Sequence, residues 1–560
     1  MRTMHCRRML IWLLPISLPM AGCASRPVVE NPSMIFHSGN IYTFEPSMPR
    51  ASAVAVTDGR ITAIGSDEAV LATAGPKTRR ISLEGRTVTP GLIDAHAHMV
   101  SQGSMETGRL NLAYTKSFDE VLAIVTERIA TGQPGKWVLG SLCDNAKWGQ
   151  KAFPTHERLS AISPGNPVWL RRNDGHMALA NGKAMAMAGI TRDTPDPPGG
   201  EILRDEHGEP NGLFVDNAMD LITRHIDRDP DVSDELLAAQ AACLAVGLTG
   251  VHDAGISPAE VETYRRLCDE DKLLIRIYAM LDAGEAVAYT AKHRPLIGYG
   301  GERFTLRAVK CFMDGATSTR GGWMLEPYSD RPDTVGLPVH ELDWLADVMR
   351  AAINADYQVC THACGDRGAR EALNLYEAAM AGRPGGDRRL RIEHAQNVAL
   401  DDIPRFARLG VIPSMQPTHA TSDMRWAEDR IGRERIAGAY AWAKFLRAGC
   451  RIAAGSDFPV EEVNPLEGVY SAVTRQDHDG NPPGGWYPDE CMTREEAFRA
   501  FTIDAAYAAF EENDKGTLAV GKLADFVVFD RDVLRCPAPE LLKTRVKMTV
   551  IGGEVVYAGH

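Results

Sequence analysis

Short apolar segments of strand-like composition recur along the centre of this chain, and helical stretches separate several of them. Eight such segments lie at 87–93, 250–252, 275–278, 308–310, 358–360, 391–393, 411–413 and 451–454. Helices are expected between them, for example at 343–355 and 366–381. Strands that alternate with helices form parallel sheets, because a parallel connection needs a long crossover. This pattern predicts an α/β fold, a (β/α)8 barrel over residues 91–515.

A long interval interrupts the predicted barrel after its first strand. Residues 105–226 are too many for one crossover, and they contain their own strand, at 167–170, and their own helix, at 118–131. We therefore expect an inserted α+β domain that covers the barrel as a lid.

Both ends of the mature chain are β-like. Residues 53–56 and 60–64 are joined by Asp58-Gly59, a dipeptide typical of tight hairpin turns. The same kind of segment returns at 524–530 and 546–557. Because two separate β flaps would each leave open strand edges, we expect the two ends to meet in one small β-sandwich. Its predicted parts are residues 24–90 and residues 516–560.

The first 23 residues have the features of an export signal. A basic start precedes an apolar run at 9–20 that is too short to span a bilayer comfortably. Ala21-Gly22-Cys23 resembles the cleavage box of bacterial lipoproteins, which would make Cys23 the lipidated first residue of the mature protein. The expected location is the periplasm or the outer membrane, with contact to the membrane only through this anchor. An ordinary signal peptide with a chance cysteine is the alternative.

The net charge and the cysteine count bear on the partners and on the disulfides that we expect. The formal net charge is -13, so the chain has no basic surplus and nucleic acid is not an expected partner. Of 11 cysteines, Cys6 and Cys23 belong to the predicted signal. The other nine are odd in number and lack paired spacing, so most are expected to be buried small hydrophobic residues rather than disulfide partners.

The strongest local motif follows the first predicted strand of the barrel. His96 and His98 alternate, so both side chains point the same way and can face one metal ion. A His-x-His pair alone is a weak signal. The other metal-ligand types then follow in order, each at a predicted strand end: Lys310, His362, His394 and Asp457. Singly, each has an ordinary interpretation as a surface lysine, a core histidine or a helix cap. Jointly, they predict a metal site at the carboxyl ends of the strands.

This order of residues resembles the amidohydrolase superfamily. The local sequences at 91–98, 310–315, 362–366, 392–396 and 455–459 are similar to the branch that contains N-substituted formamide deformylase. The similarity extends over nearly the whole mature chain. Cys364 departs from the pattern, since an aliphatic residue is usual there, and we expect it to fill space rather than bind metal.

The resemblance implies a centre with two divalent ions, for which the ligand types favour zinc. Lys310 would be carboxylated and bridge the ions. His96 and His98 would hold the more buried ion, and His362 and His394 the more exposed one. Asp457 would contact the buried ion, accept a proton from the bridging water and pass it to the leaving nitrogen. The resulting hydroxide would attack a carbonyl carbon.

Other residues are weaker candidates for contact with the substrate. They are His176 in the insert, His252 after the second strand, and Asp314 and Arg320 after Lys310. Trp148 and His419 are candidate walls of the pocket. A homodimer is the default assembly.

The predicted reaction is hydrolysis of a C–N bond, in an amide, N-acyl or N-formyl group of a small molecule. A deaminase, or a hydrolase of lactones or cyclic imides, is the alternative enzyme on the same site. A lipoprotein that binds metal or ligand without catalysis is the alternative outside enzymes.

Overall fold

The computed structural model describes residues 31–149, 153–226, 231–381 and 386–559. The predicted signal peptide and Cys23 lie outside these residues. Within the described part of the chain, no helix combines the length and apolar character that crossing a membrane requires.

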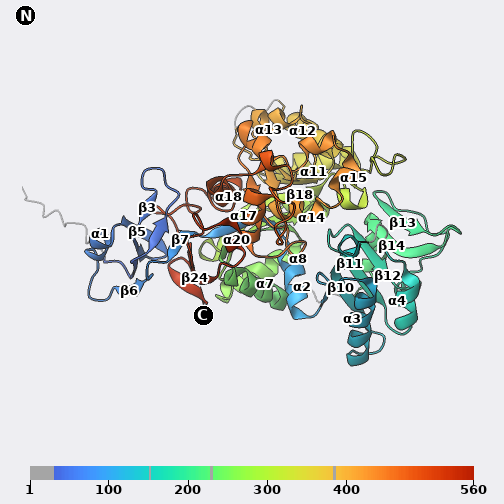
Figure 1. The fold of residues 1–560 in the computed structure, drawn as a ribbon, viewed down its shortest axis with the longest axis horizontal. Coiled ribbons are helices and arrows are strands. Elements are labelled where there is room, and N and C mark those ends of the chain that lie inside the picture. Colours follow the sequence, from blue (N-terminus) through green and yellow to red (C-terminus); the bar gives the residue numbers. More distant parts are fainter. Residues whose placement is uncertain (1–30, 150–152, 227–230, 382–385, 560) are drawn as a thin grey trace, which may run out of the picture.

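Eight parallel strands form the central barrel (Figure 1). They are β8 (Leu92–Ala97), β15 (Leu248–Ile256), β16 (Arg276–Asp282), β18 (Phe304–Phe312), β19 (Gln358–Ala363), β20 (Arg391–His394), β21 (Ile412–Met415) and β22 (Ala453–Ala454). Neighbours in this list are paired in register. The last strand meets the first through backbone bonds just beyond β22, where Asp457 N donates to His96 O at 2.8 Å. The predicted (β/α)8 fold class is confirmed.

Amphipathic helices pack around the barrel. In α11 (Leu342–Asn354), Leu345, Val348, Met349 and Ala352 are buried, at the spacing of one helix face. The others on this ring include α7 (Ser233–Ala245), α8 (Pro258–Asp269), α9 (Ala283–Thr290), α12 (Asp366–Met380), α13 (Ile403–Leu409), α16 (Trp442–Arg447), α17 (Pro465–Thr474), α18 (Arg494–Ala500) and α19 (Ile503–Ala508). The predicted helices 343–355 and 366–381 correspond to α11 and α12.

The long interval after β8 holds a six-stranded mixed sheet with its own helices, at the lower right of Figure 1. Its strands, in sheet order, are β13 (Gly200–Arg204), β14 (Pro210–Asp216), β12 (Met177–Ala180), β11 (Val168–Arg172), β10 (Val138–Cys143) and β9 (Leu110–Asn111). The helix α3 (Phe118–Thr131) begins where Ser117 caps it by accepting from Glu120 N. Two apolar clusters fill this insert, so it has a core separate from that of the barrel.

The two ends of the described chain build one pair of packed sheets. One sheet consists of β5 (Arg60–Gly65), β4 (Ala53–Thr57), β1 (Met34–His37) and β6 (Arg79–Ser82). The other combines both ends: β25 (Glu554–Ala558), β24 (Val546–Ile551), β23 (Phe526–Phe529), β7 (Thr87–Pro90), β2 (Asn40–Tyr42) and β3 (Arg50–Ala51). Phe36 and Phe526 meet edge to face between the sheets, with ring centroids 4.8 Å apart. Each end thus covers apolar surface of the other.

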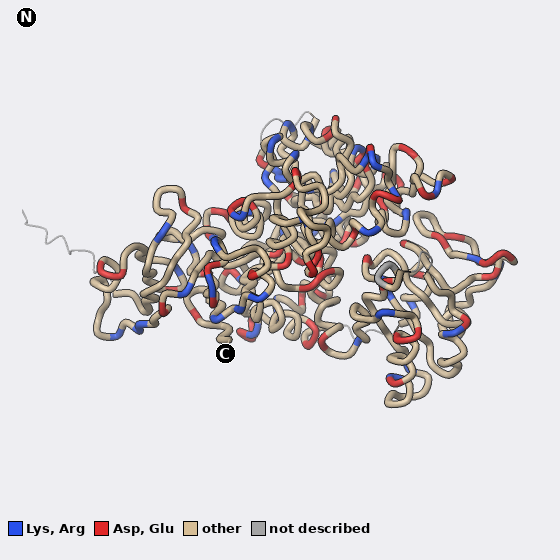
Figure 2. Tube along the Cα trace, in the orientation of Figure 1, with Lys and Arg blue, Asp and Glu red and all other residues tan. Residues whose placement is uncertain are grey.

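Charges and cysteines are spread over these parts. Basic and acidic residues are interspersed along the barrel, insert and sandwich (Figure 2). The nine cysteines of the described residues are free thiols, seven of them buried.

Candidate metal centre

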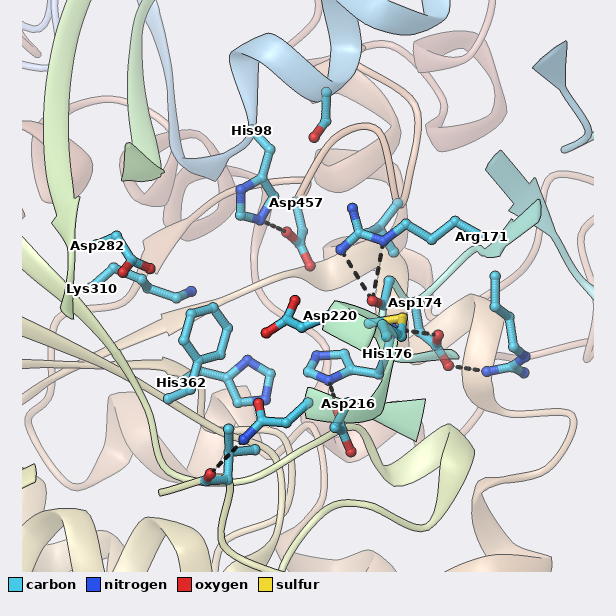
Figure 3. A pocket seen from close by; sticks show the side chains of 18 of the residues that line it. His98, Arg171, Asp174, His176, Asp216, Asp220, Asp282, Lys310, His362 and Asp457 are labelled. Atoms are coloured by element: carbon cyan, nitrogen blue, oxygen red, sulfur yellow. Dashed lines mark hydrogen bonds and ion pairs between the residues drawn. The ribbon is translucent and has the colours of Figure 1, made fainter. Parts of the chain in front are cut away.

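The carboxyl ends of the barrel strands open into a cavity of about 440 Å³ beneath the insert. Figure 3 shows the side chains that converge there. Barrel residues on its wall include His98, Lys310, His362, His394 and Asp457. His96 lies directly behind them, in contact with both Lys310 and Asp457. The structure therefore brings all six predicted ligands together.

His96 is fully buried and held from both sides of its ring. Its Nδ1 lies 2.5 Å from Oε2 of Glu393, and its Nε2 lies 3.0 Å from Nζ of Lys310. Burial, together with the charge of Lys310, lowers the pKa of His96 to about 4. The ring is thus neutral at physiological pH, which is the form that binds a metal ion.

His98 and Asp457 face each other beside His96. His98 Nε2 lies 3.2 Å from Asp457 Oδ1, and its Nδ1 donates to the carbonyl of Ala254 at 2.9 Å. Although burial opposes ionisation of Asp457, its close contact with His98 and the neighbouring imidazoles of His96 and His419 hold the pKa of Asp457 well below its usual range. Its Oδ1 is buried with no hydrogen-bond partner in the part of the chain that the structure describes. An anionic oxygen in this position is available to a cation.

Lys310 ends β18 inside the same cluster. Burial lowers its pKa from the ordinary 10.5, because a charged amine loses its hydration there. Its Nζ also lies 4.9 Å from the ring centroid of Phe312. Burial thus makes the amine easier to deprotonate than an exposed lysine.

A second group of ligand atoms surrounds the other carboxylate oxygen of Asp457. Two sets, His96–His98–Asp457 and His394–His419–Asp457, each place one ligand atom per residue within 4.8 Å of the others. His394 is oriented by Gln416, whose Oε1 lies 2.9 Å from its Nδ1. His419 Nε2 lies 3.8 Å from Asp457 Oδ2 and is a buried donor or acceptor without a hydrogen-bond partner among the described residues.

His362 lies next to this second set rather than in it. Its ring is 4.5 Å from that of His394, and its Nε2 faces the carbonyl of Gly315 at 3.4 Å. That contact leaves Nδ1 as its free ligand atom. Burial lowers the pKa values of His362 and His394 far below the ordinary 6.5. The imidazoles of His96, His362 and His394 with lowered pKa, the ionised carboxylate of Asp457 and the unpartnered buried atoms form a donor set that fits divalent metal ions.

Residues that the sequence analysis did not single out support the ligands. Glu393 also pairs with Arg391 at 2.7 Å, and both side chains are fully buried. Asp94 accepts from the backbone and hydroxyl of Ser456, which precedes Asp457, at 3.0 and 2.7 Å. Burial raises the pKa of Asp94 to about 7. The only sequence signal for Asp94 and Glu393 is their place within one or two positions of a ligand. His419 was expected only as a wall of the pocket; the structure places it after β21 on the helix α14 (Pro417–Asp423).

The predicted substrate contacts separate into two groups. His176 lines the cavity from the insert, with its ring 5.0 Å from that of His362 and its Nδ1 2.6 Å from Asp216 Oδ1 (Figure 3). His252, Asp314 and Arg320 are not among the described residues on the cavity wall.

His252, Asp314 and Arg320 make other contacts. His252 is buried below the centre, 3.0 Å from Arg391. Asp314 is buried and accepts from the backbone of Cys364, Gly365 and Trp323, so it shapes a loop. Arg320 binds Asp330 on the outer side of that loop.

Trp148 and Cys364 are not predicted ligands, and the structure shows where each of them lies. Trp148 donates to Thr115 O at 2.8 Å and packs on the core of the insert, away from the cavity. Cys364 lines a small adjoining cavity of about 50 Å³ together with His394 and His419.

The sequence of this chain is similar to those of known proteins. The family model described as "Amidohydrolase family" matches residues 79–557. The chain is 33% identical to Protein LONG AFTER FAR-RED 3 of Arabidopsis thaliana, over 96% of this chain and 93% of that protein. It is 30% identical to the N-substituted formamide deformylase of Arthrobacter pascens, over 93% and 97%.

A solved structure shares both fold and sequence with this chain. It is an uncharacterized metal-dependent hydrolase from Pyrococcus furiosus, 27% identical, with a TM-score of 0.71 over 90% of this chain and 100% of that one. The family match covers the barrel, the insert, every predicted ligand and the part of the sandwich from residue 79 onwards. The chain belongs to the amidohydrolase family.

Proposed function

We propose that this protein is a metal-dependent hydrolase that cleaves a C–N bond, in an amide, N-acyl or N-formyl group, of a small molecule. The observation that carries the proposal is the pair of ligand sets that share Asp457 at the mouth of the barrel. The 30% identity to a formamide deformylase supports the choice of bond. The cavity of about 440 Å³ is of the size that holds small molecules.

Two divalent ions, zinc by ligand preference, would be held by His96 and His98 on one side and by His394 with His362 or His419 on the other. Lys310 contacts His96, and burial lowers its pKa towards release of the proton, which reaction with CO2 requires, so we propose that it is carboxylated and would bridge the ions. When bound, such ions lower the pKa of a water molecule and polarise a carbonyl group.

The chain's own residues would move the protons. Asp457 is ionised and reaches both ligand sets, so it can accept the proton of the attacking water and return it to the leaving nitrogen. His176 is held at Nδ1 by Asp216, which leaves Nε2 to contact the substrate from the side of the insert. The insert also covers the centre, which limits access of bulk water to the reacting atoms.

The test combines metal analysis with turnover on protein that lacks residues 1–23. We expect about two metal ions per chain and turnover of some member of an N-formyl, N-acetyl and N-acyl-amino-acid panel. Asp457→Asn should lower kcat by about a thousandfold or more, because the proton acceptor is lost. Asp479→Asn, an exposed change, is the matched control.

Other outcomes assign the alternatives. One metal ion per chain, unchanged in Lys310→Ala, with release of ammonia from ring amines, would favour a deaminase. Turnover of lactones or cyclic imides alone would show that the enzyme hydrolyses a ring bond rather than an open-chain amide. Bound metal without turnover on any of these panels would contradict the enzymatic proposal and favour a binding protein.

We also propose that the protein is exported and carries a lipid on Cys23, which rests on the sequence of residues 1–23 alone. Growth of producing cells with labelled palmitate should label the wild type. Cys23→Ser should abolish the label, and retention of the label in that variant would contradict the proposal.

A further inference from the structure

A second large cavity, of about 390 Å³, lies between the insert and the barrel loops, outside the metal centre. Three arginines reach its wall: Arg172 from β11, Arg320 from the loop after β18, and Arg430 from the helix α15 (Ala427–Ile431). Among the described residues that line it, none is an aspartate or glutamate. The cavity wall therefore carries three guanidinium groups and no carboxylate among these residues.

The three arginines differ in their partners. Arg320 is neutralised by Asp330, with nitrogen–oxygen distances of 3.1 and 2.6 Å. Arg172 is paired with Asp174. Arg430 instead has two buried nitrogens, Nε and Nη1, with no hydrogen-bond partner among the described residues.

An unpartnered buried guanidinium is unusual, because each lost hydrogen bond costs free energy and the charge has lost part of its hydration. Burial and the charges of Arg320 and Arg172 lower the pKa of Arg430 to about 10. Its guanidinium carbon lies 4.9 Å from the ring centroid of Trp426. This contact orients the group but supplies no acceptor to Nε and Nη1. Both nitrogens are closed off from solvent, so a ligand in the cavity would act on the charge of the guanidinium as a whole, and an anion would offset that charge.

Apolar side chains also line the cavity. Phe153, Leu203 and Leu213 of the insert lie there. A ligand that matches both the arginines and the apolar side chains has an oxyanion and an apolar group. We propose that this cavity binds a small organic anion, a carboxylate or a phosphate ester with an apolar group, and that Arg430 is its principal contact.

The site is separated from the metal centre by a single polar layer. Arg172 Nη1 donates to Ser318 Oγ at 3.0 Å, and Asp174 accepts from both residues. Arg172 lines both cavities. The anion can therefore be a separate ligand or the far end of a long substrate. The inference does not depend on the proposed reaction, because the site is defined by its own contacts.

Titration calorimetry on the metal-loaded protein tests the site with benzoate and phenyl phosphate, and with benzamide as a neutral analogue. We expect both anions to bind, and benzamide to bind about tenfold more weakly or worse, since it lacks the charge. Arg430→Gln should weaken binding of the anions about tenfold or more. Arg433→Gln, whose side chain is 90% exposed on the next turn of chain, is the matched control and should bind as wild type does.

Two results would overturn the proposal: no binding of either anion to the wild type, or equal binding to Arg430→Gln, which would assign the anion to the metal centre. If Arg430→Gln does not fold, protection of Arg430 from phenylglyoxal by benzoate, mapped by mass spectrometry on the wild type, replaces it. Absence of protection overturns the site. Once a substrate is known, competitive inhibition by benzoate that Arg430→Gln relieves identifies the anion as part of the substrate. Arg430-dependent binding without competition identifies a separate ligand.

Discussion

The Nδ1 atom of His96 lies 2.5 Å from Oε2 of Glu393, and this contact determines which ring nitrogen faces the metal centre. Glu393 is itself fixed by Arg391, at 2.7 Å, inside the barrel. Burial opposes ionisation of Glu393, but the charge of Arg391 and the hydrogen bond from His96 outweigh it and lower the pKa of Glu393. A permanent carboxylate therefore holds the proton on Nδ1 and leaves Nε2 free for a ligand bond.

Glu393→Gln should weaken metal binding by about tenfold to a hundredfold, because an amide orients the imidazole less strongly and makes it less basic. Competition with a chelator, measured by the free zinc concentration at half occupancy, gives the size of the effect. Glu377→Gln, a helix-surface change, is the control. Equal zinc affinity of Glu393→Gln and wild type would show that the contact does not orient a ligand.

His419 gives the second prediction, because the structure and the sequence differ on which histidine completes the second ligand set. If His419 binds the ion, His419→Ala should reduce bound metal from about two ions per chain towards one. If His362 does so alone, His419→Ala should keep both ions, and His362→Ala should lose one. Metal analysis after dialysis against chelator separates the two cases, with the exposed His478→Ala as control.

The sequence predicted the barrel because eight apolar strand-like segments alternate with helical ones, and it predicted the metal site because five of these strands end at a residue with metal-binding chemistry. The same reasoning missed His419, which lies on a helix after its strand rather than at the strand end. It also missed the pairing of Asp94 with Ser456, since residues 362 positions apart meet only when the barrel closes. In the insert, one of six strands was expected. The alternation there is weak, and pairing with distant segments decides which residues become strands.

A buried ion pair joins the barrel to the sandwich and gives a prediction on stability. Arg276 Nε and Nη2 lie 2.6 and 2.8 Å from the two carboxylate oxygens of Asp525, and both side chains are 3% exposed. Burial opposes ionisation of Asp525, but the charge of Arg276 outweighs it and lowers the pKa below 3.8. The stabilisation is thus present above the unfolded pKa and is lost as pH falls through the folded one.

Asp525→Asn should lower the free energy of unfolding by about 3 kcal/mol or more at neutral pH, because it leaves the guanidinium buried and uncompensated. Glu209→Gln breaks the exposed pair with Arg192 and should cost about 1 kcal/mol or less. Urea denaturation of the two variants measures both effects. Similar losses of unfolding free energy in the two variants would contradict a larger contribution from the buried ion pair.

Glu467, on α17, gives a prediction for alkaline pH. Burial and the neighbouring charges of Glu462 and Glu461 raise its pKa to about 8, from an ordinary value of 4.5. Between these two values the folded state keeps a proton that the unfolded state releases. The contribution of Glu467 to stability is therefore complete below the unfolded pKa and is lost as pH rises through the folded pKa.

Glu467→Gln cannot release a proton, so its stability should fall less than that of wild type over this range. We expect the variant to gain roughly 1–3 kcal/mol relative to wild type between about pH 5 and about pH 9. Urea denaturation at several pH values measures the difference, with the exposed Glu495→Gln as control. If all three proteins gave parallel curves, Glu467 would already be ionised in the folded state. The contact at 3.4 Å with His478 would then outweigh burial and the two glutamates.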